Sequence, residues 1–213
     1  MPFNGNNPYD STGIVHNNLL EYLINYIPAD DTSGTGRASA LKDGIYSLYD
    51  SLGLTMADAD SLIQWISNNF HAGESQQWLN SYIANYSSPR CTQRELGYIH
   101  QIGQAFEVAT DSAGIMNALL SIEYAMVHEN WEEEETIALG AISIAKNSTY
   151  SALTKQVGGC LSAEIYACSV DYTSYLASMD ADCDRKKAER SSAGMSAVAY
   201  ALYICWEHWN PEG

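Results

Sequence analysis

Residues 137–145 constrain the fold of this chain most, because they are apolar around a whole helical circumference and rich in small side chains. A helix that is apolar on every side is usually buried at the centre of a domain, and small side chains let its neighbours approach closely. Apolar residues recur with helical periodicity along the rest of the chain, and no stretch alternates as a strand does. We therefore expect an all-α fold, a multi-helix bundle or orthogonal array of about eight or nine helices around a buried central helix near 136–153.

The chain of 213 residues is long enough to bury a complete core, and no shift in composition marks a domain boundary. We expect a single helical domain over 1–213, with 87–92 as the place where a minor seam would fall.

Thr92 and Glu95 have the spacing of a capping box for the helix that follows them. Asp111 restarts the helical pattern, so the segments on its two sides form either two helices or one long bent helix.

The formal net charge of −16 is the strongest global property of the sequence. It argues against nucleic acid and anionic membranes as partners, because both would be repelled. It permits a basic protein partner or bound cations, although a solvated acidic surface is the simplest reason for it. No apolar run is long enough to span a membrane.

The start of the sequence lacks the basic and hydrophobic regions of a signal peptide. The chain as it stands is therefore expected in the cytoplasm, and in the cell envelope or outside the cell if a leader has been removed. The five cysteines are odd in number and show no paired spacing, which indicates buried thiols more than a disulfide framework.

The N-terminal segment has the highest density of residues suited to helix capping, close helix packing and hydrogen bonding. Asp10 is placed to cap the first helix by accepting a hydrogen bond from the backbone N–H of Thr12 or Gly13. Gly13 costs helix propensity but leaves room for a second helix to approach. His16 falls on the apolar stripe of a helix that ends near Ile27, so it is expected to point inward and to need a partner. The candidate ligand-binding residues of this segment are Tyr9, Asp10, His16 and Asn17.

Two stretches together resemble a known group of proteins. They are the opening, Asn7-Pro8-Tyr9-Asp10 followed by Gly13 and His16-Asn17, and the apolar segment at 141–148, Ala-Ile-Ser-Ile-Ala-Lys-Asn-Ser. This pattern resembles a group of uncharacterised all-helical bacterial proteins, many of which are exported or lipid-anchored. The resemblance covers less than a fifth of the chain and implies an all-helical fold without implying an activity.

Metal sites find little support in the sequence. Helical di-iron proteins use Glu-x-x-His pairs, and none of the five histidines has one. Asp180, Asp182 and Asp184 imitate the first half of a calcium-binding loop, but Arg185 stands where glycine is needed and Ser191 where a bidentate glutamate is needed. We expect an acidic loop that caps the next helix and no cofactor, with calcium as the alternative left open.

Two further clusters have a structural and a functional interpretation. The acidic run at 132–135 suits the N-terminal end of a helix, where the helix dipole favours carboxylates, and it also suits a basic partner. Trp206 and Trp209 near the C-terminus are candidate ligand-binding residues, because aromatic side chains at helical spacing either belong to the core or line a groove.

Three functional hypotheses follow from these patterns. The leading one is a helical domain that binds a protein, peptide or carbohydrate ligand and carries out no chemistry. The second is an enzyme in which His16, Asp10 and Glu123 serve as acid–base groups. The third is an acidic antagonist of immunity type that binds a basic protein by charge complementarity. Neither a nucleophile elbow nor a phosphate-binding loop is present in the sequence.

Overall fold

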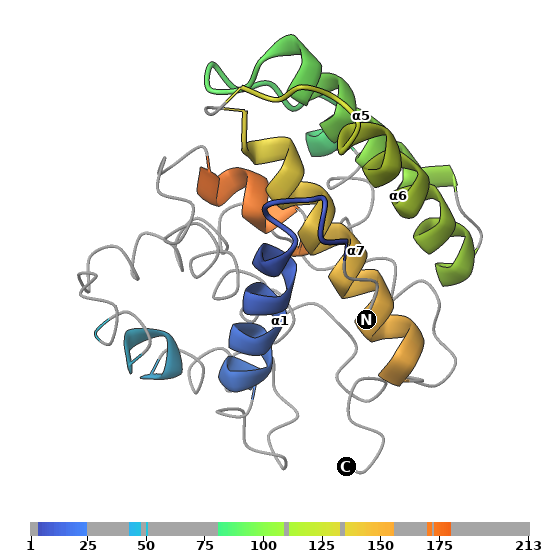
Figure 1. Cartoon of the computed structure of the whole chain (residues 1–213). Coiled ribbons are helices and arrows are strands. Elements are labelled where there is room, and N and C mark those ends of the chain that lie inside the picture. Colours follow the sequence, from blue (N-terminus) through green and yellow to red (C-terminus); the bar gives the residue numbers. More distant parts are fainter. Residues whose placement is uncertain are drawn as a thin grey trace.

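The computed structural model describes residues 4–24, 43–47, 50, 81–108, 111–132, 135–155, 170–171 and 173–179. Its long helices within these ranges are α1 (Ser11–Ile24), α5 (Gln93–Val108), α6 (Ser112–Met126) and α7 (Ile137–Lys155) (Figure 1). No β-strand occurs in the described ranges, so the all-α class predicted from the sequence is confirmed for this part of the chain.

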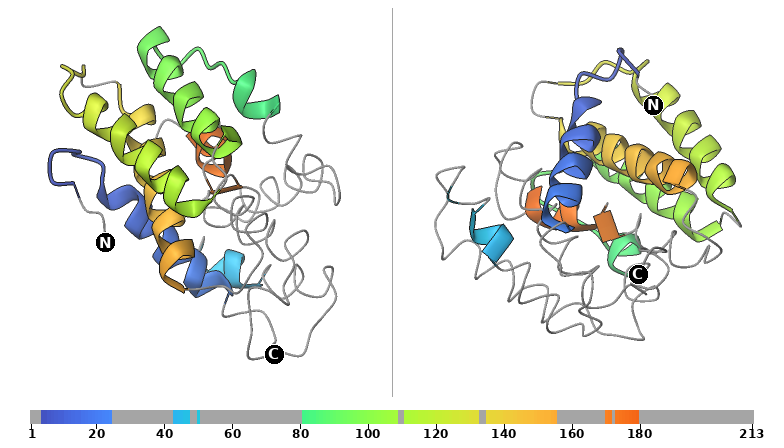
Figure 2. Two further views of the ribbon diagram at one scale, coloured as in Figure 1. Left: turned by 90° about the vertical axis from the view of Figure 1, so that its right-hand side faces the viewer. Right: turned by 90° about the horizontal axis from the view of Figure 1, so that it is seen from below.

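Helix α7 forms the centre of the described structure. Every residue from 137 to 149 is buried, which includes the apolar segment 137–145 and the polar residues 146–149 that follow it. α1 packs against one side of α7, and α5 and α6 pack against the other, so that α7 lies between them (Figures 1 and 2). The small residue Gly140 of α7 makes room for a further segment, 173–179, since an added Cβ atom there would lie 2.7 Å from Cζ of Tyr175.

The helices α5 and α6 begin as the sequence predicted. Thr92 and Glu95 form the capping box, in which the Thr92 N–H donates to Glu95 Oε2 at 3.0 Å and the Glu95 N–H donates to Thr92 Oγ1 at 3.2 Å. Asp111 has an extended backbone and accepts from the Gly114 N–H at 2.6 Å, as an N-cap residue does. α5 and α6 are therefore two helices, and the alternative of one long bent helix is wrong.

The prediction that the Asp10 carboxylate caps the first helix is wrong. The Thr12 N–H donates to the carbonyl of Tyr9 at 2.9 Å, and the Gly13 N–H donates to Ser143 Oγ at 2.9 Å. The carboxylate of Asp10 instead binds the side chain of Lys146. A buried cation outcompetes two backbone N–H groups for this carboxylate, because charge-assisted hydrogen bonds are the stronger ones.

The total of eight or nine helices stays a prediction, because 25–42, 51–80, 156–169 and 180–213 lie outside the described residues. Among the residues that are described, no helix has the length and apolar character needed to cross a membrane.

Candidate functional site

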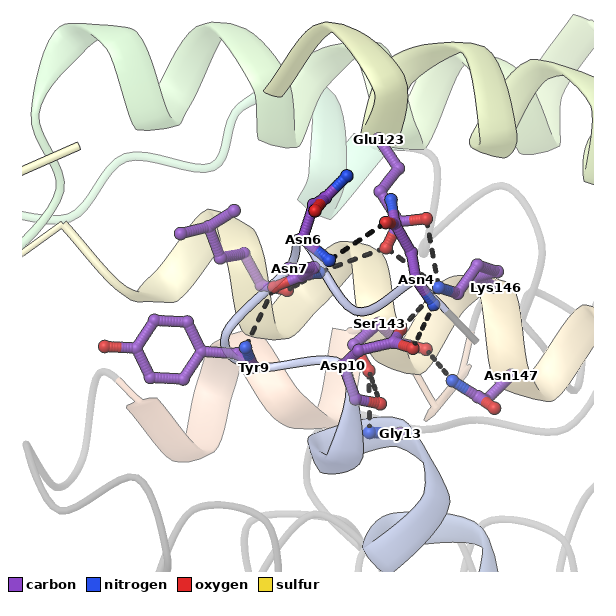
Figure 3. A network of polar contacts seen from close by, with 11 residues as sticks. Asn4, Asn6, Asn7, Tyr9, Asp10, Gly13, Glu123, Ser143, Lys146 and Asn147 are labelled. Atoms are coloured by element: carbon purple, nitrogen blue, oxygen red, sulfur yellow. Dashed lines mark hydrogen bonds and ion pairs between the residues drawn. The ribbon is translucent and has the colours of Figure 1, made fainter. Parts of the chain in front are cut away.

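The N-terminal segment Asn4–Asp10 lies against the middle of α7 and beside α6, where their polar side chains converge (Figure 3). The residues involved come from positions more than a hundred apart in the chain, and most of them are buried. The two stretches that carry the family resemblance therefore contact each other. We call this cluster of Asn7, Asp10, Glu123, Ser143 and Lys146 the buried polar network.

Lys146 occupies the centre of the network. Its Nζ atom donates to Glu123 Oε1 at 2.8 Å and to Oε2 at 3.0 Å, and it contacts Asp10 Oδ1. The side chain of Lys146 is 0% exposed, and those of Asp10 and Glu123 are each 1% exposed. One ammonium group thus lies between two carboxylates in a place that excludes water. A buried charge is tolerated only when it is paired and hydrogen-bonded in this way.

The N-terminal segment completes the network with its own polar groups. Asn7 Nδ2 donates to Glu123 Oε1 at 3.1 Å and to the carbonyl of Leu139 at 3.3 Å. The backbone N–H of Asn4 donates to Asp10 Oδ2 at 2.7 Å. Both carboxylates therefore accept hydrogen bonds from the lysine and from a second donor, which holds each of them in one orientation.

Gly13 and Ser143 join α1 to α7 directly beneath this network. Ser143 Oγ donates to the carbonyl of Asp10 at 2.7 Å and accepts from the Gly13 N–H. A Cβ atom at Gly13 would lie 2.7 Å from Asn147 Nδ2 and closer still to the backbone of Ser143. The prediction that Gly13 leaves room for a neighbouring helix is confirmed, and that helix is α7.

His16 points inward, as the helical stripe predicted, and its side chain is fully buried. Its Nδ1 atom lies 3.1 Å from Asn17 Oδ1, and Ser148 Oγ donates to that same oxygen at 3.3 Å. Asn17 therefore connects α1 to α7, and His16 contacts the same Asn17 oxygen. Tyr9 is half-buried, with its ring packed against the core.

The sequence interpretation singled out Asp10 and Glu123, and the structure brings both onto the same lysine. It did not single out Lys146, although this residue stands inside the apolar segment that was expected to be buried. A lone lysine between Ile144, Ala145 and other buried residues is the signal that could have revealed it, since lysine is almost never fully buried unless it is paired. The candidates Trp206, Trp209, Asp180, Asp182 and Asp184 lie outside the described residues.

A second polar cluster connects the start of α5 with the start of α7. Glu95 is fully buried, and besides its capping box its Oε1 accepts from the N–H of Ile137 at 3.0 Å. Ile137 is the first residue of α7, so one carboxylate satisfies N–H groups at the beginnings of two helices.

Arg94 fixes the connection between α6 and α7. It pairs with Glu135, lies 3.6 Å from a carboxylate oxygen of Glu129, and stacks 4.6 Å from the ring centroid of Trp131. Within the predicted acidic run, Glu135 is thus buried and paired rather than available to a partner, whereas Glu132 is exposed.

Tyr98 shares this cluster through its hydroxyl group, which donates to Glu129. Burial is the main cause that raises the pKa of Tyr98 to about 12. The hydrogen bond to Glu129 and the negative charge of Glu129 raise this pKa further, whereas the positive charge of Arg94 lowers it.

A shallow hollow of about 150 Å³ lies between the 81–86 segment and α5, lined by Ile83, His100 and Glu107 among others, and it does not include the buried polar network. Among the described residues, no three acidic, histidine or cysteine side chains converge closely enough to hold a metal ion.

Comparisons with protein-family models, with curated proteins and with solved structures gave no match to this chain.

Proposed function

We propose that the chain is a single helical binding domain of eight or nine helices that engages a basic segment of a protein partner. The observation that carries this proposal is the burial of the acid–base candidates. Asp10, His16 and Glu123 are each at most 1% exposed, and Asp10 and Glu123 both bind Lys146 of α7. A substrate has no route to these groups in the described geometry, which favours binding by the surface over an enzyme.

The described surface is acidic. Its exposed side chains include the carboxylates of Glu21, Asp43, Asp50, Glu107, Asp111, Glu129 and Glu132. The basic side chains described with them are mostly committed to internal contacts. Lys146 is buried, and Arg94 pairs with two glutamates of the α6–α7 connection. Such a surface attracts basic partners and speeds their association, with a strong dependence on salt.

The outer face of α6 is the best candidate for the contact. Leu120 and Tyr124 lie one helical turn apart there, 39% and 67% exposed, and the Tyr124 ring stacks on His128 with 4.3 Å between centroids. The exposed carboxylate of Asp111 stands just before the first residue of this helix. That of Glu129, which also contacts Arg94 and Tyr98, lies three residues beyond its last. A basic peptide with an apolar middle fits this arrangement, because its cations would meet these carboxylates or the face of Tyr124.

The test is fluorescence anisotropy with a labelled helical peptide that carries lysines at both ends and leucines in the middle. We expect binding that weakens as salt increases, and no binding of a matched peptide with glutamate in place of lysine. The double variant Leu120→Ser/Tyr124→Ser should weaken binding about tenfold or more, since central aromatic contacts dominate such interfaces.

Val15→Ser is the matched control, because Val15 is a partly exposed apolar residue on α1, across α7 from this face. Equal affinity of the lysine and glutamate peptides, or equal loss in both variants, would refute the proposal. Salt-independent binding of a neutral oligosaccharide, with no binding of the basic peptide, would establish the carbohydrate alternative in its place.

A further inference from the structure

We propose that Lys146 and Asp10 are joined by an intramolecular amide bond, formed by their side chains with Glu123 as the catalytic residue. The buried polar network then is a covalent modification site that ties the start of α1 to the middle of α7. This inference concerns the interior of the protein and is independent of the partner proposed for its surface.

Proximity is the first argument. Lys146 Nζ contacts Asp10 Oδ1, so the amine lies next to the carboxyl carbon that it would attack. Two reacting groups held in this way react as if at very high concentration, because the fold has already removed their freedom to separate. Ser143 Oγ holds the backbone carbonyl of Asp10 at 2.7 Å, which fixes the reacting residue on α7.

Burial is the second argument. The side chains of Lys146, Asp10 and Glu123 are at most 1% exposed. An amide replaces the buried ion pair of Lys146 and Asp10 by a neutral group. Glu123 then keeps two hydrogen-bond donors, Asn7 Nδ2 and the N–H of the new amide. Exclusion of water also opposes the reverse reaction, because hydrolysis of the amide needs a water molecule at the same carbon.

The third argument is that the network supplies each group that condensation requires. Glu123 contacts Nζ through both of its oxygens, at 2.8 and 3.0 Å, and can therefore take a proton from the attacking amine. Asn7 Nδ2 donates to Glu123 and keeps it in this position. The Asn4 N–H donates to Asp10 Oδ2 at 2.7 Å, which places a donor on the oxygen that becomes negative during attack.

The reaction balances with the atoms present. The ammonium of Lys146 passes one proton to Asp10 Oδ1, giving a neutral amine and a carboxylic acid. The nitrogen lone pair forms a bond to Cγ of Asp10 while the electron pair of the C=O bond moves onto Oδ2, beside the Asn4 N–H. Glu123 accepts a second proton from the nitrogen and delivers it to Oδ1, and the Cγ–Oδ1 bond breaks to release one water.

The product is a neutral amide that keeps the third proton on the former lysine nitrogen, with Glu123 again a carboxylate that can accept from it. No oxidant, metal or cofactor is consumed. The Arg94–Glu135 pair offers a contrast within the same fold, because its guanidinium stays protonated and is a poor nucleophile, and its arginine is one-third exposed. We therefore expect no covalent bond between Arg94 and Glu135.

The test is the intact mass of the purified full-length chain, denatured and reduced. We expect a mass lower by one water than the sequence specifies. Trypsin should then fail to cleave after Lys146, and tandem mass spectrometry should find the peptide 1–37 joined to the peptide 95–155. Recovery of the full sequence mass, with separate peptides ending at Arg37 and Lys146, would overturn the proposal and leave a buried ion pair.

A water can also be lost by cyclisation at Asp10-Ser11, and the peptide map separates the two outcomes. Cyclisation confines the loss to the peptide 1–37, and this result too would overturn the proposal. Glu123→Gln and Lys146→Arg should each show the full mass of their own sequences, with helicity by circular dichroism reporting on folding. Glu95→Gln removes a different buried carboxylate, and it should retain the loss of one water.

Discussion

The contact between α1 and α7 at Gly13 gives the sharpest stability prediction, because the chain contains a matched control. Gly13 and Gly97 both lie inside helices, but a Cβ atom at Gly97 would meet nothing within 4 Å. At Gly13 the same atom would crowd the backbone of Ser143 and lie 2.7 Å from Asn147 Nδ2. The substitution to alanine is therefore the same chemical change in two opposite environments.

The expected magnitudes follow from two opposing terms. Replacing glycine by alanine in a helix favours folding by about 1 kcal/mol. Inserting a methyl group into a packed site costs about 1–3 kcal/mol, and the upper end applies at Gly13 because backbone atoms cannot turn aside. Gly13→Ala should therefore lose about 2 kcal/mol, whereas Gly97→Ala should gain up to about 1 kcal/mol.

Urea unfolding followed by circular dichroism measures both values, and thermal unfolding gives a second readout. For a chain of this size we expect Tm to fall by about 4–8 °C in Gly13→Ala and to rise by about 2–4 °C in Gly97→Ala. If Gly13→Ala is as stable as Gly97→Ala, then α1 and α7 are not packed as closely as described. The geometry of the buried polar network, which depends on this packing, would then be wrong as well.

Three further predictions concern the two polar clusters. Lys146→Met should cost about 3–5 kcal/mol in urea unfolding, because it removes the α7 partner of Asp10 and Glu123 and leaves both carboxylates buried; a loss below about 1 kcal/mol would contradict their burial. Glu95→Ala should lower the free energy of unfolding by about 1–3 kcal/mol, since it leaves N–H groups of α5 and α7 unsatisfied. The amide of Ile137 should then exchange its hydrogen faster, an effect that Glu107→Ala on the exposed face of α5 should not produce. Because the pKa of Tyr98 is raised to about 12, its hydroxyl stabilises the native state fully below the ordinary pKa near 10, and this stabilisation is lost as pH rises through 12. NMR titration of ring-labelled tyrosine, with the Tyr98 signal assigned by Tyr98→Phe, measures this pKa. Glu129→Gln should lower it, and an unchanged value would show that Glu129 does not contribute.

Local patterns in the sequence predicted the parts of this structure that local forces determine. The capping box of Thr92 and Glu95, the N-cap at Asp111 and the inward direction of His16 depend on residues within a few positions of each other. The burial of residues 137–145 follows from composition, since almost all of them are apolar, whereas the burial of the polar residues 146–149 does not. These features could be predicted without knowing how the helices pack.

The buried polar network could not be predicted in this way, because its members are brought together by the fold. Lys146 binds Asp10 across 136 positions and Glu123 across 23. The expected cap by Asp10 was wrong for the same reason: a distant lysine competes with the local N–H groups. Glu95 shows the same limit, since its capping box was predicted but its second hydrogen bond, to the start of α7, was not.

The distance in sequence between Asp10 and Lys146 has a consequence for synthesis of the chain. Asp10 leaves the ribosome 136 residues ahead of its partner, which corresponds to about 7–30 s at typical elongation rates. Throughout this interval α1 has no α7 to pack against, and the Gly13 N–H lacks the Ser143 hydroxyl to which it donates. The first helix of this protein is thus expected to gain its contacts with α7 only after α5 and α6 have been synthesised.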